Sequence, residues 1–343
     1  MTVNVSKPAI NVREKLAELD KPTGIAGEAM LRAETPQEQF NLIGAGRRNL
    51  IINGDFQVSQ RGDYSSATAV SDSNYYLDRW QVWSGVSATL THISANQPNG
   101  GSLTKSAKVT ATSSATSDLR LLQRVEFPSN YGGQTVTLSA WIKTNSPNCR
   151  MYFYNDAYLT STETDPVTPD EEWHYVTLSI VVASGLSNFI PIIGIDGSTS
   201  STVSISSGEY FEITGVQLEL GKVATPFEHR SYGEELALCQ RYYYKGGVIG
   251  GRAGISAGYT SSSTSVRWTF VTPSNMRATP TYSAGSNPYA ADNGTNREVS
   301  SVSVLGATQN TISMIGTIAG SGSHRSLTIS YGGSQNFKLD AEL

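Results

Sequence analysis

Alternation of apolar and polar residues after residue 48 limits the folds open to this chain more than any other feature of the sequence. In the segment 135–144, TVTLSAWIKT, apolar residues occupy every second position, namely Val136, Leu138, Ala140 and Ile142. Successive side chains of a β-strand point to opposite faces of a sheet, so such a segment has one buried face. The same pattern recurs at 176–182, 203–205 and 216–220. Half-buried strands are therefore expected to form most of the chain.

Turn-forming residues separate these segments, without helical patterns between them. Examples are the stretches Asn130 to Gly133 and Asp196 to Ser198. Short strands that recur about every ten residues between such turns are typical of antiparallel sandwiches. The sequence therefore predicts a mainly β protein, with a short N-terminal helical anchor, a jelly-roll β-sandwich and a second C-terminal β domain.

Composition divides the chain into four regions. Residues 1–48 are predicted to be an attachment and assembly segment, because the first 50 residues hold 13 of the 54 charged residues but only 4 of the 78 serines and threonines. Residues 49–230 are expected to form the sandwich, and residues 231–245 a helical and aromatic connector that includes a short helix from Gly233. The distal β domain is expected at 246–343, with a long loop between Ser283 and Arg297.

Residues 8–20 have the spacing of a short amphipathic helix. Its apolar stripe consists of Ile10, Val12, Leu16 and Leu19. A helix of about 13 residues is marginal alone in water, so the stripe needs a surface to pack against. These four residues are predicted to attach the chain to a larger assembly or to copies of itself.

Charge is scarce in this chain. Charged residues make up 16% of it, the net charge is −4 and the isoelectric point is about 5.6. The sequence therefore lacks the basic field that draws proteins to nucleic acid or to anionic lipid. It also lacks an apolar stretch near the roughly 20 residues that span a bilayer. We expect neither nucleic-acid binding nor membrane insertion, and we expect synthesis in a cytoplasm.

Catalytic and metal-binding motifs are not evident. Cys149 and Cys239 are 90 residues apart and lack metal-ligand neighbours, and none of the four histidines lies in a hydrolase motif. Carboxylates gather at 165–172 and at Glu234 and Glu235, where they are expected to be solvated charges. No cofactor, no metal and no catalytic residue is predicted. A hydrolase site assembled between subunits is the alternative that a single chain leaves open.

Five strings of the sequence resemble modules of bacteriophage tail fibres and related virion structural proteins. They lie at 47–62, 75–80, 122–127, 135–144 and 216–245. The last of them, VQLELGKVATPFEHRSYGEELALCQRYYYK, is the most specific. The opening residues 1–24 are also similar to the starts of such fibres. The C-terminal domain resembles the variable tips of fibres only in type.

This resemblance implies a homotrimeric tail fibre in the phage virion, made in the host cytoplasm. Its N-terminus would join other phage tail proteins, and its β domains would bind host-surface glycan without catalysis. A tail-assembly or head-fibre component that contacts only virion proteins is the alternative, and a glycan depolymerase is a further one. The implied jelly roll is similar to carbohydrate-binding modules, in which an early loop helps to bind a structural Ca²⁺ ion. Asn53 and Asp55 match that loop, but the usual acidic pair is missing from 215–219.

Aromatic residues are the candidates for sugar stacking, because their flat faces suit the C–H faces of sugars. Trp141 has the parity opposite to the apolar face of its strand, and Tyr152 and Tyr154 alternate with Met151 and Phe153. The alternative is that these rings fill a core or a subunit interface. Trp80, in the string YYLDRW, is expected in the core, with its neighbours Asp78 and Arg79 pairing locally.

Three tyrosines of the distal domain are further candidates for receptor contact. Tyr259, Tyr282 and Tyr289 lie in or beside segments rich in glycine, serine and asparagine. Antibody paratopes use this composition, because tyrosine supplies rigid contact area beside adaptable polar neighbours. The alternative is that they are ordinary turn tyrosines.

Overall fold

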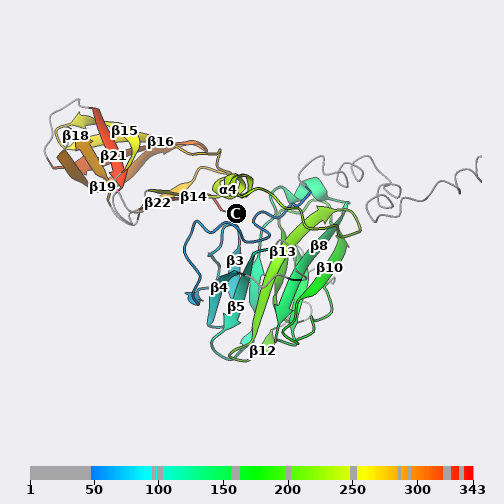
Figure 1. Cartoon of the computed structure of the whole chain (residues 1–343). Coiled ribbons are helices and arrows are strands. Elements are labelled where there is room, and N and C mark those ends of the chain that lie inside the picture. Colours follow the sequence, from blue (N-terminus) through cyan, green and yellow to red (C-terminus); the bar gives the residue numbers. More distant parts are fainter. Residues whose placement is uncertain are drawn as a thin grey trace, which may run out of the picture. The chain divides into compact units, whose positions relative to one another are not determined.

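The computed structural model describes residues 48–94, 98, 103–155, 163–197, 202–247, 253–284, 287–292, 295–319, 326–331 and 336–342. Residues 49–343 form one compact unit, which contains every strand described below. The predicted attachment stripe of Ile10, Val12, Leu16 and Leu19 lies outside the described residues. Within the described ranges no helix is long and apolar enough to cross a membrane. The chain is mainly β, as predicted (Figure 1).

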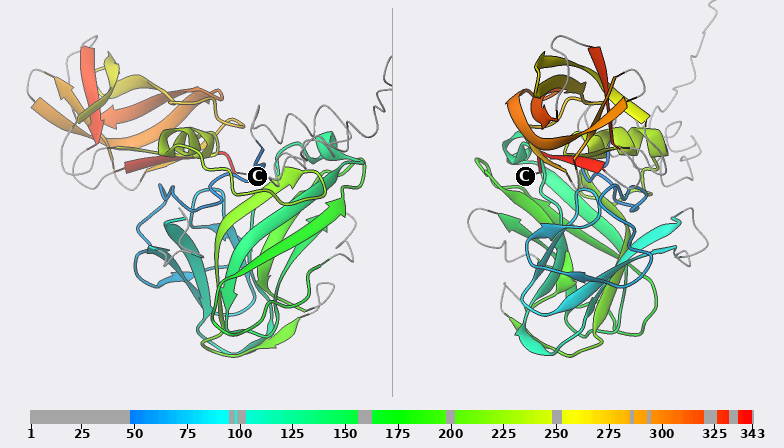
Figure 2. Two further views of the ribbon diagram at one scale, coloured as in Figure 1. Left: turned by 45° about the vertical axis from the view of Figure 1, so that its right-hand side comes forward. Right: turned by 90° about the vertical axis from the view of Figure 1, so that its left-hand side faces the viewer.

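Two antiparallel sheets form a sandwich after residue 67 (Figures 1 and 2). Sheet A has six strands, in the order β1 (Thr68–Val70), β4 (Ala88–Ser94), β5 (Lys105–Ala111), β13 (Tyr210–Leu220), β8 (Thr135–Thr144) and β10 (His174–Val181). Sheet B has five strands, in the order β2 (Asn74–Tyr75), β3 (Gln81–Ser84), β7 (Leu119–Leu122), β11 (Phe189–Ile195) and β9 (Cys149–Asn155). A ribbon of β12 (Val203–Ile205) and β6 (Ala115–Ser117) and the 3₁₀ helix η2 (Pro128–Tyr131) complete this part of the chain.

The core of the sandwich is formed by the apolar residues that occupy every second position of the strands. Val136, Leu138, Ala140 and Ile142 of β8 are all fully buried between the two sheets. Trp80 is 1% exposed and belongs to the same core, which confirms the prediction for this residue. The alternating apolar residues of these strands are therefore buried, as predicted, and the residues between them point to the outer face of their sheet.

Buried hydrogen bonds join the beginning of the sandwich sequence to its end. The Asn49 side chain donates to the carbonyl of Val216 at 3.1 Å and accepts from the backbone N–H of Leu218 at 3.0 Å. The Arg230 guanidinium donates to the carbonyl of Asn49 and, at 3.1 Å, to that of Ile51. The helix α4 (Tyr232–Gln240) follows directly and confirms the predicted short helix. The two longest strings of the fibre resemblance therefore meet in the fold.

The C-terminal part of the chain contains a three-stranded sheet and a closed barrel (Figure 2). The sheet has the order β14 (Tyr243–Gly247), β22 (Asn336–Asp340) and β17 (Thr281–Ala284). The barrel has the order β15 (Ala253–Ser262), β16 (Ser265–Val271), β20 (Thr311–Ile318), β19 (Thr295–Ala307), β18 (Tyr289–Asp292) and β21 (Ser326–Tyr331). The long loop predicted between Ser283 and Arg297 is wrong, because β18 and the start of β19 pair within it. The polar and small residues of β18 and of the start of β19 form strands because they pair with each other, and β18 also pairs with β21.

Residue 342 is held by two arginines of the sandwich. The Glu342 carboxylate accepts from Arg61 at 2.9 Å and also pairs with Arg79. The side chains of Arg79 and Glu342 are only 1% and 5% exposed. The predicted local pairing of Asp78 with Arg79 is wrong, since Asp78 accepts from Gln60 instead, at 2.6 and 2.7 Å. The partner of Arg79 lies 263 residues away in the sequence.

Candidate functional site

The outward face of sheet B collects an apolar floor with aromatic rings above it. Its buried residues form a small cluster that is separate from the main core, namely Leu122, Tyr152, Ile190 and Ile192. Trp83 of β3 and Tyr154 of β9 are half-buried and pack against this cluster. Three strand spacings separate β3 from β9 in the sheet, yet the two rings meet edge to face with centroids 6.0 Å apart. The rings therefore reach across the face and cover the floor.

Polar groups border this aromatic pair. The Arg124 guanidinium lies 5.6 Å from the centre of the Trp83 ring, and its Nη1 is 3.5 Å from Oδ1 of the exposed Asn188. We call Trp83, Tyr154, Arg124 and Asn188 the sheet B patch. It combines two flat rings, a guanidinium and an amide, which are the groups that recognise polar ligands with C–H faces.

Tyr152 lies beneath the patch and is 2% exposed. Its hydroxyl donates to the Asp196 carboxylate, which also accepts from Nε of Arg120 at 2.8 Å. Burial raises the pKa of the Tyr152 phenol, and the Asp196 charge adds to this effect against the opposing charge of Arg120. The phenol therefore stays neutral and fixes the floor. The outward parity predicted for Tyr152 and Tyr154 is correct, but only Tyr154 reaches the surface.

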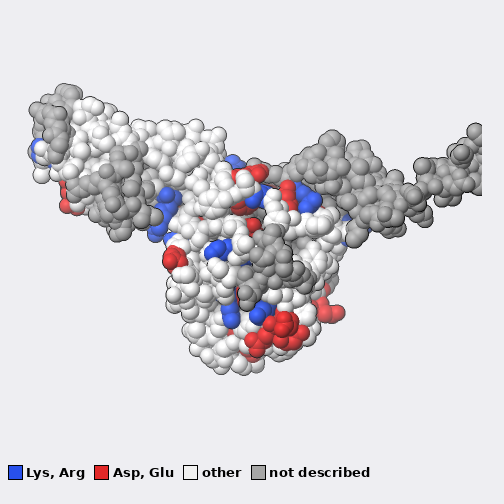
Figure 3. Space-filling model, viewed as in Figure 1, with Lys and Arg blue, Asp and Glu red and all other residues white. Residues whose placement is uncertain are grey.

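Trp141 lies on the outward face of the other sheet. It stands directly opposite Tyr175 of β10, with ring centroids 5.1 Å apart and an interplanar angle of 50°. Trp141 is half-buried, whereas 44% of Tyr175 is exposed. Most of the described surface visible in Figure 3 carries neither basic nor acidic side chains, so the pair lies on a molecule with sparse surface charge.

The three distal tyrosines do not form one site. Tyr259 of β15 is 50% exposed and Tyr289 of β18 is half-buried. They stand opposite Ser326 and Ser330 of β21, and four residues along a strand correspond to about 13 Å. Tyr282 lies elsewhere, on β17, with its ring 6.2 Å from that of Phe337.

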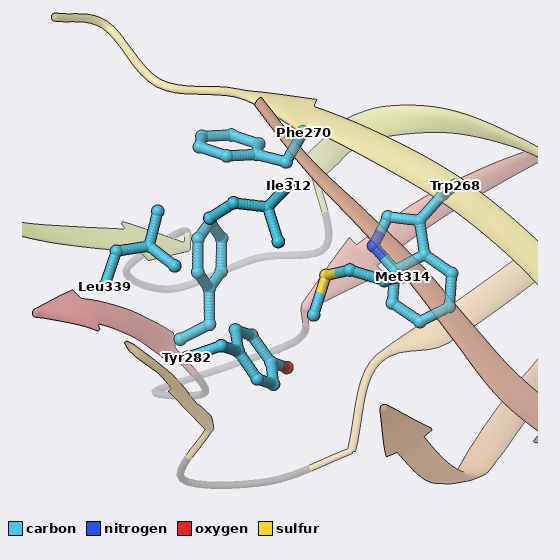
Figure 4. A pocket seen from close by; sticks show the side chains of 7 residues that line it. Trp268, Phe270, Tyr282, Ile312, Met314 and Leu339 are labelled. Atoms are coloured by element: carbon cyan, nitrogen blue, oxygen red, sulfur yellow. The ribbon is translucent and has the colours of Figure 1, made fainter. Parts of the chain in front are cut away.

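Tyr282 belongs to an apolar cluster where the barrel meets the three-stranded sheet (Figure 4). The cluster consists of Trp268, Phe270, Tyr282, Ile312, Met314, Phe337 and Leu339. The side chains leave no room for a water molecule between them. Tyr282 thus contributes its ring to packing, and Nε1 of Trp268 is buried there without a hydrogen-bond partner.

In the loop of Asn53 and Asp55, the Asn53 side chain is fully engaged in hydrogen bonds within the protein. Asn53 is fully buried; its amide donates to the carbonyls of Val58 and Asp78, and its Oδ1 accepts from the N–H of Val58 at 2.9 Å. Burial raises the pKa of the Asp55 carboxyl. Across the described parts of the chain, no group of three or more His, Cys, Asp or Glu gathers in a way that could hold a metal ion.

The two cysteines are poorly suited to act as nucleophiles. Both are free and buried, and burial raises the pKa of Cys149 to about 12 and that of Cys239 well above its usual value. Neither thiol is therefore ionised near neutral pH. Of the carboxylates that the sequence places on the surface, Glu235 is in fact 5% exposed and pairs with Arg230 at 3.3 Å. The prediction that Glu235 is a solvated charge is wrong.

Comparison with known protein families and with curated sequences finds no match. Among solved structures, the enzymatically active domain of tailspike protein 4 of bacteriophage CBA120 is 14% identical, with a TM-score of 0.34, over 50% of this chain and 21% of that chain. A Clostridium thermocellum xylanase fragment complexed with xylohexaose is 19% identical, with a TM-score of 0.30, over 49% of this chain and 30% of that chain. A tandem family 22 carbohydrate-binding domain of Paenibacillus barcinonensis is 12% identical, with a TM-score of 0.27, over 83% of this chain and 98% of that chain. Likenesses this low carry no conclusion about function.

Proposed function

We propose that this chain is a phage tail fibre protein that binds host-surface glycan as a homotrimer, with the sheet B patch as its contact site. The observation that carries the glycan-binding part is the gathering of Trp83, Tyr154, Arg124 and Asn188 over a buried apolar floor. Sugars offer apolar C–H faces to aromatic rings and hydroxyls to amides and guanidinium groups. The virion setting and the trimer rest on the sequence resemblance.

The patch suits weak, repeated binding. It lies on the face of a sheet rather than in a deep cleft, so each copy buries little ligand surface and binds weakly. A trimer presents three copies on one particle, and linked sites raise avidity by about 10² to 10⁴ without new contacts. A low-charge, hydroxyl-rich surface is compatible with this mode, because it limits nonspecific attraction to charged polymers.

Trp83→Ala is expected to weaken glycan binding at least tenfold, because it removes the larger of the two stacking rings. Loss of a central aromatic contact typically costs about 2 kcal/mol, and about 1.4 kcal/mol is tenfold in Kd. Calorimetry or a glycan array on the full chain, below the melting temperature of each variant, measures the change. Tyr232→Ala is the matched control, since Tyr232 is 58% exposed and lies on α4. Unchanged glycan binding by Trp83→Ala would show that the sheet B patch is not the glycan contact site.

The pair of Trp141 and Tyr175 supports a second candidate contact, either with glycan or with another subunit. Tyr175→Ala removes an exposed ring and leaves the core parity of β10 intact, so we expect the melting temperature to change by less than a few degrees. Light scattering and glycan binding on the same sample separate the two roles. A fall from trimer to monomer mass identifies a subunit contact, and a loss of binding at constant mass identifies a sugar contact. If both quantities stay constant, the pair serves neither role.

The depolymerase alternative has a direct test. Incubation of the full chain with the glycans that it binds would release reducing ends if the protein were a hydrolase. We expect no release, because the sheet B patch contains neither a carboxylate pair nor an ionised nucleophile among the described residues.

A further inference from the structure

Three arginines point outward from the region of sheet B, and two of them are neutralised within the protein. Nε of Arg120 lies 2.8 Å from the Asp196 carboxylate, and its Nη2 lies 3.2 Å from that of Asp118. Nη1 of Arg150 lies 2.7 Å from the Glu163 carboxylate. A guanidinium that is paired with a carboxylate has little net charge left with which to attract an anionic ligand.

Arg124 differs from both. Among the described residues, no carboxylate lies within ion-pair distance of it, and its one side-chain hydrogen bond is the 3.5 Å contact with the exposed Asn188. Its guanidinium is instead held over the Trp83 ring, at 5.6 Å. The Arg79 guanidinium, 1% exposed, donates to the Arg124 carbonyl at 2.8 Å, which fixes the backbone from which this side chain extends. Arg124 is therefore a half-buried, positioned cation that no carboxylate of the described chain neutralises, and its Nε is buried without a hydrogen-bond partner.

This arrangement matches an anionic sugar. A guanidinium presents parallel N–H donors that fit a carboxylate in a bidentate manner, and a neutral hydroxyl uses only one of them. The neighbouring Trp83 ring offers a face for the C–H side of the same sugar, and the Asn188 amide can reach a hydroxyl beside the carboxylate. The whole chain has a net charge of −4, so attraction of an anionic polymer has to come from a local cation of this kind.

We propose that the sheet B patch selects a carboxylate-bearing sugar, a uronic or sialic acid, and that Arg124 is the residue that binds its carboxylate. This inference rests on the proposed glycan-binding function. It assigns the ligand class, whereas Trp83 and Tyr154 alone accept neutral and acidic sugars alike.

The test compares matched pairs of oligosaccharides on the full chain. Each uronate or sialate oligosaccharide of the panel is paired with its carboxyl-reduced counterpart, which keeps the ring and loses the charge. We expect the wild type to bind at least one carboxylate form about tenfold or more tighter than its reduced partner, and to lose this preference in Arg124→Gln. Arg124→Lys is expected to keep part of it, because an ammonium group supplies charge without the bidentate geometry. Arg267→Gln, at an exposed arginine of β16, controls for the loss of one positive charge.

The outcomes separate this inference from the proposed function. Equal binding of both members of every pair, with loss of binding in Trp83→Ala, would overturn the acidic ligand class and leave glycan binding intact. Selective carboxylate binding that Arg124→Gln does not change would overturn the role of Arg124. If the wild type bound no member of the panel, acidic or reduced, both the inference and the proposed glycan site would be overturned.

Discussion

Glu342→Ala is expected to lower the free energy of unfolding by about 3–5 kcal/mol, which is the usual cost of removing one partner of a buried ion pair. The Glu342 carboxylate is shared by Arg61 and Arg79, and the Arg79 side chain is only 1% exposed. Without Glu342, the Arg79 guanidinium stays desolvated with no carboxylate on it. Its position 3.6 Å from the centre of the Tyr242 ring compensates for little of that cost.

Chemical denaturation of the full chain measures this loss. Glu172→Ala is the matched control, because Glu172 is exposed and forms no ion pair with the described residues. We expect it to change the free energy of unfolding by less than about 0.5 kcal/mol. The double variant Arg79→Met with Glu342→Ala should recover much of the loss, since a buried pair replaced by apolar groups is often neutral. Equal stability of Glu342→Ala and the wild type would mean that Glu342 does not form ion pairs with Arg61 and Arg79 in solution.

Strand parity is the part of this molecule that the sequence predicts well. It places Val136 and its apolar neighbours in the core and Trp141 outward, and the structure agrees for both. Parity depends on two adjacent residues alone, so a local pattern is sufficient to determine it. The same argument could have found Trp83, which follows the core residue Val82 in β3, although β3 is too short to show a repeated alternation.

Contacts between distant segments are the part that sequence reasoning misses. Arg79 follows Asp78 directly, which suggests a local pair, but its carboxylate partner is 263 residues away. Likewise, Tyr152 has the correct parity, yet its hydroxyl is held inside by Asp196, which follows β11, and this carboxylate also binds Arg120 of β7. No periodicity encodes these partners, because the fold alone determines which loops and strands become neighbours.

The most specific string of the fibre resemblance is explained by folding contacts. Arg230 caps carbonyls of the 49–51 segment and pairs with Glu235, and the Asn53 N–H donates to the same glutamate. These side chains are buried or nearly so, and none belongs to the sheet B patch. The string therefore identifies a way of closing the sandwich, whereas the ligand-binding residues lie outside it.

Gly54→Ala tests this closure and is expected to cost about 3 kcal/mol or more, at or above the usual range for overpacking. A Cβ at residue 54 would lie 2.1 Å from the carbonyl oxygen of Val216, a backbone atom that cannot swing away. The same strand contact carries the hydrogen bond from the Val216 N–H to the Gly54 carbonyl, at 2.9 Å. One added methyl group therefore forces the 49–56 segment away from β13.

Gly233→Ala is the control for this prediction, because nothing lies within 4 Å of its Cβ position in α4. Alanine there should leave stability unchanged or raise it by up to about 1 kcal/mol, since alanine favours helices over glycine. Denaturation midpoints of both variants give the comparison. A Gly54→Ala chain as stable as the wild type would show that the 49–56 segment does not lie against β13.

Glycan binding by the same variant separates closure from recognition. Trp83 and Tyr154 of the sheet B patch stand on β3 and β9. Arg124 and Asn188 lie just after β7 and just before β11, whereas residue 54 contacts β13 of the other sheet. Below its melting temperature, Gly54→Ala should therefore bind glycan with the Kd of the wild type while its stability falls. Trp83→Ala should show the reverse order of effects, with a large change in Kd and a smaller one in stability. Opposite responses of the two variants would place fold closure and ligand contact in different residues of the same sandwich.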